Sequence, residues 1–386
     1  MITTTFSALG SIYDGPHATP TRLDEGPYFL NIASLQNGRL DLAQSDHLSG
    51  DDFVRWTRRV TPRGGDLLFS YETRLGSAAL MPDGVDACLG RRMALLRPHR
   101  GVIDPRYLLF RYLAPDFQET IRSNAIHGAT VDRIPLTSMG AWPIQVHPLE
   151  EQRAIAEVLG ALDDAIAAND RVIAQAERLA VALASRGALT VPLAQISEHS
   201  RVTTNPGVMG DAIVDHYSLP AYDTAKMPER SHATSILSGK FRIVQPSVLI
   251  SKLNPRFPRV WDVPTVNNCS VSSTEFIILE PKSVSTSVLW ALLSQPSVSD
   301  YLCERAAGTS GSHQRVKPHD LLTMPVGDPA SLEIQAQDRI TGICASVYAK
   351  RRQNQALAAL RDALLPELMS GRMRVKDAQQ RVEEAI

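Results

Sequence analysis

The sequence contains one pattern twice, with 180 to 183 residues between corresponding positions. The segment Asp66–Ser70 returns as Ser247–Ser251, and each copy runs into a long segment with helical periodicity. A chain that repeats at this period folds into two similar units. Further matching positions are Cys88 and Cys269, Met93 and Phe276, Pro98 and Pro281, Gly128-Ala129-Thr130 and Gly308-Thr309-Ser310, Arg133 and Arg315, and Trp142-Pro143-Ile144 and Met324-Pro325-Val326.

Two segments predict long helices, at residues 148–188 and 330–370. The first begins with Pro148 and two acids, which suit a helix N-terminus. Apolar residues recur every three or four positions in both segments, and one small domain cannot bury such long stripes. We therefore expect the two helices to pack together as an antiparallel, coiled-coil-like pair. The expected stripe includes Ile155, Val158, Leu162, Ile166, Val172 or Ile173, Ala176, Leu179 and Leu183 in the first helix, and Ile334, Ile340, Ile343 or Cys344, Val347, Leu357, Leu360, Leu364 and Leu368 in the second.

Polar residues interrupt both stripes near their middles. If the helix midpoints coincide, Asn169 lies close to Asn354. A polar residue inside a helix seam lowers stability but fixes the register. We predict that Asn169 and Asn354 set the register of this pair; the alternative is that both face solvent.

These features predict an α+β fold: two similar mixed α/β domains joined by two long antiparallel helices, with an internal pseudo-two-fold repeat. The expected boundaries are a first domain at 1–147, a spacer helix at 148–188, a second domain at 189–329, a second spacer helix at 330–370 and a tail at 371–386.

Composition limits the function classes. The 386 residues carry a formal net charge of −1, so nucleic-acid binding would depend on local patches or on a partner's charges. The four cysteines form no C-x-x-C pair, which predicts free thiols in a reducing compartment. The sequence shows no signal peptide and no apolar run of membrane-spanning length, so we expect a cytoplasmic protein without membrane contact.

Motifs for catalysis are missing from the sequence. It contains no [ND]-P-P-[YF] amino-methyltransferase motif, no phosphate-binding P-loop and no dinucleotide fingerprint. The ten histidines are scattered, and no metal-ligand spacing occurs. Paired acids such as Glu150-Glu151 and Asp163-Asp164 indicate helix caps and solvated faces. We therefore predict a non-catalytic chain that binds no metal or cofactor itself.

Basic residues gather at related places in the two repeats. Residues 226–260 hold seven Lys or Arg and one acid, a local balance of +6, and Trp261 follows directly. The first repeat has Arg55, Trp56, Arg58, Arg59 and Arg63 in the corresponding region, diluted by acids. Each cluster alone is also compatible with a solvated face. Their repetition beside the repeated strands favours DNA, in which a split site offers two similar halves.

Several motifs in order resemble one family, the specificity (S) subunits of type I restriction-modification systems. The resemblance covers essentially the whole chain; the second helix start, residues 328–335, keeps only a remnant of the Leu-Glu-Glu-Gln pattern of the first. The segments that carry it are Pro148–Ala156 with Leu159 and Leu162-Asp163, Ser218–Asp223, Ser251–Arg256, Gly308–Val316 and Leu364–Gly371.

The resemblance implies a sequence-specific DNA reader with two target-recognition domains, each reading one half of a split, asymmetric site. The helices would set the gap and dock methyltransferase (M) subunits, two of them by expectation, and a motor-nuclease (R) subunit would complete the complex. S-adenosylmethionine, ATP and magnesium are expected on those partners. The residues expected to contact double-stranded DNA are Arg58, Arg59, Arg63, Tyr71 and Arg74 in the first domain, and Lys252, Asn254, Arg256, Arg259, His313, Gln314, Arg315 and Lys317 in the second, with the Gly308–Ser312 backbone near phosphate.

Three other readings remain open at this point. The chain could be a fused enzyme with a degenerate motif, or a scaffold whose paired helices hold two protein-binding domains without DNA. It could also belong to a related methylation or phage-defence system. Salt-sensitive DNA binding separates a reader from a scaffold.

Overall fold

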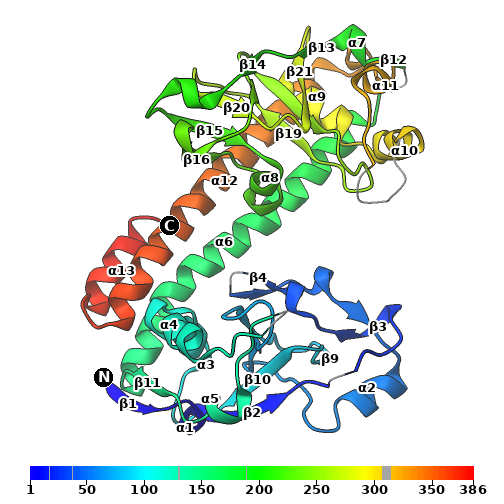
Figure 1. Cartoon of the computed structure of the whole chain (residues 1–386). Helices are drawn as coiled ribbons and strands as arrows, with labels where there is room; N and C mark the ends of the chain where they lie inside the picture. Colours follow the sequence, from blue (N-terminus) through cyan, green and yellow to red (C-terminus); the bar gives the residue numbers. More distant parts are fainter. Residues whose placement is uncertain (17, 37, 129–130, 188, 307–313) are drawn as a thin grey trace. The chain divides into compact units, whose positions relative to one another are not determined.

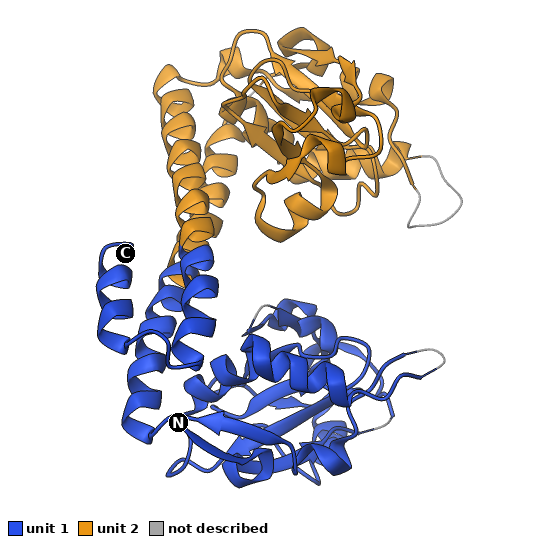
Figure 2. Ribbon diagram, turned by 60° about the vertical axis from the view of Figure 1, so that its left-hand side comes forward, with its two compact units in different colours: residues 1–166, 357–386 blue, residues 167–356 orange. Residues whose placement is uncertain are grey.

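The computed structural model describes residues 1–386 except 17, 37, 129–130, 188 and 307–313 (Figure 1). The chain forms two compact units (Figure 2). Unit 1 consists of residues 1–166 and 357–386, and unit 2 consists of residues 167–356. Both units combine helices and sheets, which confirms the predicted fold class.

Unit 1 is built on an antiparallel four-stranded sheet in the order β2-β10-β7-β8. A smaller sheet has the order β6-β3-β9, and β1 pairs with β11 just before the long helix α6 (Leu149–Ala184). Its strands are β1 (Ile2–Thr5), β2 (Gly10–Asp14), β3 (Leu23–Phe29), β4 (Leu35–Gln36), β5 (Arg39–Leu40), β6 (Asp46–His47), β7 (Leu67–Ser70), β8 (Ala78–Leu80), β9 (Ala87–Cys88), β10 (Met93–Pro98) and β11 (Pro143–Val146). Its shorter helices are α1 (Phe6–Leu9), η1 (Ile32–Ser34), η2 (Leu42–Gln44), α2 (Gly50–Trp56), α3 (Pro105–Leu113), α4 (Pro115–Asn124), α5 (Leu136–Met139) and α13 (Val375–Glu383).

Unit 2 repeats this plan. Its antiparallel sheet has the order β13-β21-β18-β19, β12 pairs with β22, and a five-stranded sheet has the order β14-β17-β20-β15-β16. Its strands are β12 (Thr190–Pro192), β13 (Ser197–Ser200), β14 (Thr203–Thr204), β15 (Ile213–Tyr217), β16 (Glu229–His232), β17 (Lys240–Arg242), β18 (Ser247–Ser251), β19 (Val260–Val263), β20 (Ser270–Ser272), β21 (Phe276–Pro281) and β22 (Pro325–Gly327). Its shorter helices are α7 (Leu193–Ile196), η3 (Pro206–Met209), α8 (Leu219–Ala225), η4 (Ala233–Ser235), α9 (Thr286–Leu293), α10 (Pro296–Arg305), α11 (Pro318–Leu322) and η5 (Pro329–Ser331).

The residue pairing shows that the sequence repeat is a structural repeat. Met93 begins β10 and lies opposite Ser70, and Phe276 begins β21 and lies opposite Ser251. The parallel pairing of β3 with β9 returns as the parallel pairing of β15 with β20. The repeated motif at Gly128 and Gly308 lies partly outside the described residues.

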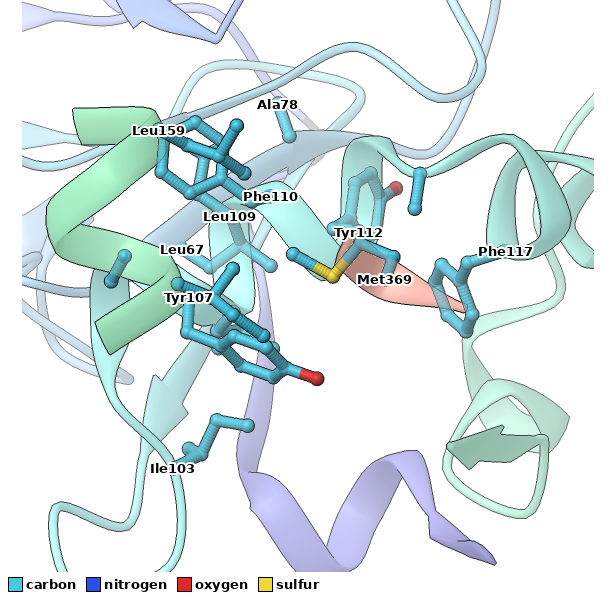
Figure 3. Packing of buried hydrophobic residues seen from close by; sticks show 14 of the residues in the cluster. Leu67, Ala78, Ile103, Tyr107, Leu109, Phe110, Tyr112, Phe117, Leu159 and Met369 are labelled. Atoms are coloured by element: carbon cyan, nitrogen blue, oxygen red, sulfur yellow. The ribbon is translucent and has the colours of Figure 1, made fainter. Parts of the chain in front are cut away.

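The core of unit 1 joins segments that are far apart in the sequence (Figure 3). Leu67 of β7, Tyr107 and Phe110 of α3, and Phe117 of α4 pack with Leu159 of α6 and with Met369, the last residue of the second long helix, α12 (Ile334–Met369). Tyr112 also lies in this cluster, where burial raises its pKa. Burial of each large apolar side chain contributes about 1.5–3 kcal/mol. Helix α13, in the segment that we expected as a tail, adds Ala378 and Val382 to the same core.

The long helices α6 (Leu149–Ala184) and α12 (Ile334–Met369) have 36 residues each. They pack together in antiparallel fashion within each unit, and an ion pair from Arg361 to Asp163 at 2.8 Å joins them in unit 1. In unit 2, Arg351 pairs with Glu177. Two residues of the expected stripes lie on the exposed surface: Leu179 is 52% exposed and Ile334 is 76% exposed. The buried seam in this part of α6 passes instead through the neighbouring small residue Ala180 and through Leu183, because one residue turns a helix face by about 100°.

Asn169 lies inside the helix seam of unit 2 and is 8% exposed. Its Nδ2 donates to Gln353 Oε1 at 3.0 Å and to Asn354 Oδ1 at 2.9 Å, and its Oδ1 accepts from Lys350 Nζ at 2.9 Å. Asn354 Nδ2 in turn donates to Asp170 Oδ1 at 2.7 Å. The two asparagines therefore face each other, and their control of register stays a prediction.

The four cysteines are free thiols. Burial raises the pKa values of Cys88 and Cys344 to about 12. Within the described part of the chain, no helix combines the length and apolar character that crossing a membrane requires.

Candidate nucleic-acid interface

The predicted DNA contacts of unit 2 gather where strand β18 ends. We call residues 252–259, between β18 and β19, the strand-end turn of unit 2, and residues 71–77, between β7 and β8, that of unit 1. Both begin in the same way: Ser251 Oγ donates to Leu253 O at 3.1 Å, and Ser70 Oγ donates to Glu72 O at 2.8 Å. A serine hydroxyl that satisfies a backbone carbonyl in this way favours a turn directly after the strand.

Each strand-end turn then contains a residue with left-handed backbone at the corresponding place. The φ angle is +72° at Thr73 and +53° at Asn254. Asparagine adopts this conformation readily, but a β-branched threonine does so rarely, and such backbone strain collects at functional sites. Because a left-handed residue occurs at this place in both units, the repeat preserves the shape of the turn while the side chains differ.

A second segment is hydrogen-bonded to each strand-end turn. In unit 2 the amide of Asn254 donates to Gln314 O at 2.9 Å, and the amide of Val316 donates to Lys252 O at 3.0 Å. In unit 1 the amide of Thr73 donates to Asp132 O at 3.2 Å, and the amide of Ile134 donates to Tyr71 O at 2.7 Å. The structure thus brings together four of the predicted contacts, namely Lys252, Asn254, Gln314 and Arg315.

An ion pair lies beside each strand-end turn. In unit 2 Arg315 binds Glu275 through two hydrogen bonds, of 3.2 and 3.0 Å, and this carboxylate raises the pKa of Arg315. In unit 1 Arg92 lies 3.2 Å from Glu72 and also donates to Thr73 Oγ1 at 3.2 Å. The carboxylate comes from the turn itself in unit 1 and from the residue before β21 in unit 2. Our sequence-based set did not include Arg92 or Arg133, although Arg133 pairs with Glu72 of the turn through a backbone bridge and corresponds to Arg315 in the repeat.

Positive charge is concentrated around Lys252. Burial lowers the pKa of Lys252, and the cations Arg201 and Arg315 lower it further, against the opposing effect of Glu275. His199 responds to the same surroundings, since burial and then Arg201 and Lys252 lower its pKa. A half-buried lysine among other cations gains from an approaching anion, and a phosphate group is the anion that DNA presents.

The remaining predicted residues of unit 2 differ in how free their side chains are to contact DNA. Arg256 and Lys317 are exposed, and no ion pair joins either of them to a residue in the described part of the chain. Arg259 binds Asp223 with hydrogen bonds of 2.6 and 2.9 Å, so its guanidinium is already engaged. His313 lies outside the described residues.

The predicted residues of unit 1 lie in three places. Arg58 and Arg59 line a recess of about 480 Å³ beside Trp56, and Arg59 pairs with Asp14 at 2.8 Å. Arg63 precedes β7, at the opposite end of that strand from the strand-end turn. Tyr71 and Arg74 belong to the turn, but Tyr71 is part of the core, where burial raises its pKa, and Arg74 donates to Ile32 O at 3.1 Å. The structure therefore does not gather this set as it gathers that of unit 2.

The fold and these turns define a duplicated α+β protein with a cation-rich turn in unit 2, and comparison with known proteins shows which proteins it resembles. Residues 29–178 match the family model described as "Type I restriction modification DNA specificity domain". A relative from Methanocaldococcus jannaschii, described as a putative type I restriction enzyme MjaX specificity subunit, is 31% identical over 147 residues, which is 35% of this chain and 32% of that protein. Residues 29–178 are thus similar to the specificity domain of type I restriction-modification systems.

A solved structure extends the likeness to nearly the whole chain. The type I restriction-modification S subunit from M. genitalium matches with a TM-score of 0.55 and 14% sequence identity, and the match covers 95% of each chain. This likeness shows a shared fold. The curated relative, in contrast, is matched over about a third of its length.

Proposed function

We propose that this chain is the DNA-recognition subunit of a type I restriction-modification complex, with each unit reading one half of a split, asymmetric site. The observation that carries the proposal is the pair of strand-end turns, which have the same backbone plan and different side chains. Two equivalent frames with different contact residues suit two half-sites of different sequence. The family match supports this assignment.

The paired helices would set the gap between the half-sites. A helix of 36 residues is about 54 Å long at a rise of about 1.5 Å per residue. Its ion pairs and the Asn169 network would hold the two helices in one register. The exposed faces of α6 and α12 would dock the methyltransferase subunits, two of them in the complete complex, and a motor-nuclease subunit would join these.

The chain itself would be non-catalytic in this proposal. S-adenosylmethionine, ATP and magnesium would be bound by the partner subunits, and the specificity subunit would supply base and phosphate contacts. Because its formal net charge is −1, much of the phosphate neutralisation would come from the partners. We therefore expect weak DNA binding by this chain alone and tight binding by the assembly; equal affinities would contradict this division of charge.

The test is to co-express the chain with the methyltransferase subunit from the same genome in a host without DNA methylation. Methylated adenines are then mapped by long-read sequencing. We expect a split motif with a gap of fixed length. A stable complex that methylates no motif and binds DNA without salt dependence would overturn the proposal in favour of a protein scaffold.

A further inference from the structure

Phe257 is exceptional among the aromatic residues. The chain has 9 Phe, 9 Tyr and 4 Trp, all within the described residues, and among these Phe257 is the one with an exposed side chain, at 63%. Scattered exposed aliphatic residues are ordinary on a protein surface, but a large ring gains most from burial. An isolated exposed ring in a chain that buries or half-buries every other aromatic residue points to a partner.

The backbone that carries Phe257 is fixed on both sides. The amide of Phe257 donates to Asn254 O at 3.0 Å and closes a tight turn, and Ser299 Oγ donates to Pro255 O at 3.1 Å. Pro255 and Pro258 flank the exposed pair Arg256-Phe257, and each proline restricts its own φ angle. A ring presented on such a turn loses little conformational freedom when it binds.

Arg259 holds the C-terminal end of the strand-end turn in place. Its guanidinium binds Asp223 through two hydrogen bonds and also approaches Phe257 O at 3.5 Å. This engagement makes Arg259 a positioning residue for the turn. The positive charge that this turn offers comes from the exposed Arg256, next to Phe257 in the sequence, and from Lys252 at its start.

We propose that Phe257 is an aromatic wedge that enters the DNA base stack at one step of the half-site read by unit 2. Apolar side chains that partly unstack a base step act together with nearby cations that bind the phosphates. The proposal rests on the proposed function and adds a specificity element to it, because flexible pyrimidine–purine steps open at the lowest cost.

Unit 1 has no equivalent wedge in its strand-end turn. Residues 71–77 contain Leu75, which packs against the core, in place of an exposed ring, and Arg74 is tied to Ile32 O. The two units would therefore deform their half-sites differently, although their strand-end turns have the same backbone plan.

The experiment uses the chain assembled with its methyltransferase subunit on duplexes that contain the mapped site, with 2-aminopurine placed at one position at a time. In the wild type we expect fluorescence to rise several-fold at one step of one half-site, because the probe is unstacked there. Phe257→Ala should abolish that rise and weaken binding about tenfold, as expected for loss of one stacked side chain. Phe257→Leu should restore much of both, since leucine also acts as a wedge.

Leu237→Ala is the matched control, since Leu237 is a 94% exposed apolar residue of unit 2 outside the strand-end turn. The melting temperatures of all variants should stay near that of the wild type, because both side chains are exposed. If the Phe257→Ala variant keeps wild-type affinity and fluorescence, the wedge proposal is overturned and the proposed function is not. Failure of the wild-type assembly to bind the mapped duplex would instead overturn the proposed function.

Discussion

Asn169 Nδ2 donates to Asn354 Oδ1 at 2.9 Å and thereby links helix α6 to helix α12 inside unit 2. The contact is nearly central in both helices, and three further polar partners surround it: Lys350, Gln353 and Asp170. A shift of one helix by a single turn would separate all of these groups.

Replacing both asparagines tests their control of register. We expect Asn169→Leu alone to lower the free energy of unfolding by about 1–3 kcal/mol, because Asn354 and Lys350 lose a buried partner. The double variant Asn169→Leu/Asn354→Leu should regain stability but populate more than one register. Distances between spin labels on α6 and α12 should be single-valued in the wild type and broadened in the double variant. An unchanged distance distribution would show that these residues do not set the register.

Arg256 is expected to read a base. Arg256→Ala should cost about 1–3 kcal/mol of binding free energy and relax the sequence preference at one position of the half-site. Competition binding with single-base variants of the mapped site measures this. Arg100→Ala is the control, since Arg100 is an exposed arginine of unit 1 outside the strand-end turn and outside the two long helices. A loss that is equal for all sequences would mean that Arg256 contacts a phosphate.

The Arg315–Glu275 ion pair should limit the charge that Arg315 offers to DNA. Glu275→Gln removes the carboxylate and should strengthen binding, with a steeper dependence on salt by about one phosphate contact. Affinities measured between about 50 and 200 mM salt give that slope. Glu72→Gln is the matched change in unit 1, where it should release Arg92. If the slope does not change in Glu275→Gln, Arg315 serves the structure of the turn and does not contact phosphate.

Asp262 should make the stability of unit 2 depend on pH. Burial raises its pKa above the ordinary 3.8, while Thr286, Ser287 and Arg351 oppose this rise. Above pH 3.8 the unfolded chain releases this proton before the folded chain does, so the unfolding free energy falls as pH rises through that window. Asp262→Asn should remove this component. Urea denaturation at several pH values should show that the unfolding free energy of the variant increases relative to that of the wild type as pH rises. A difference between the two proteins that does not change with pH would contradict the prediction.

The sequence predicted the repeated frame well, because the repeat lies in buried strands. Met93 and Phe276 are equivalent in the alignment of the two halves, and each begins one of the two inner strands of its sheet. Apolar patterns of this kind report burial directly. The helix pair followed from the same signal, although Leu179 was placed on the wrong face, because a seam lined by small residues such as Ala180 has weak periodicity.

The candidate interface was less accessible to sequence reasoning. The basic character of residues 252–259 is visible in the sequence, but the engagement of Arg259 by Asp223, 36 residues earlier, depends on the tertiary fold. The same holds for Tyr71, which occupies the position of Lys252 in unit 1 and packs into the core. Phe257 was overlooked because its exposure is a property of the turn, which local composition does not reveal.

The construction of unit 1 has a consequence for biosynthesis. Its core needs Leu364, Leu368 and Met369, which are translated after every residue of unit 2. Leu159 and its neighbours on α6 therefore emerge from the ribosome long before the chain segment that covers them. The first unit to be synthesised is thus the last to be completed, and an interrupted chain would expose apolar surface to the proteases and chaperones of the cell.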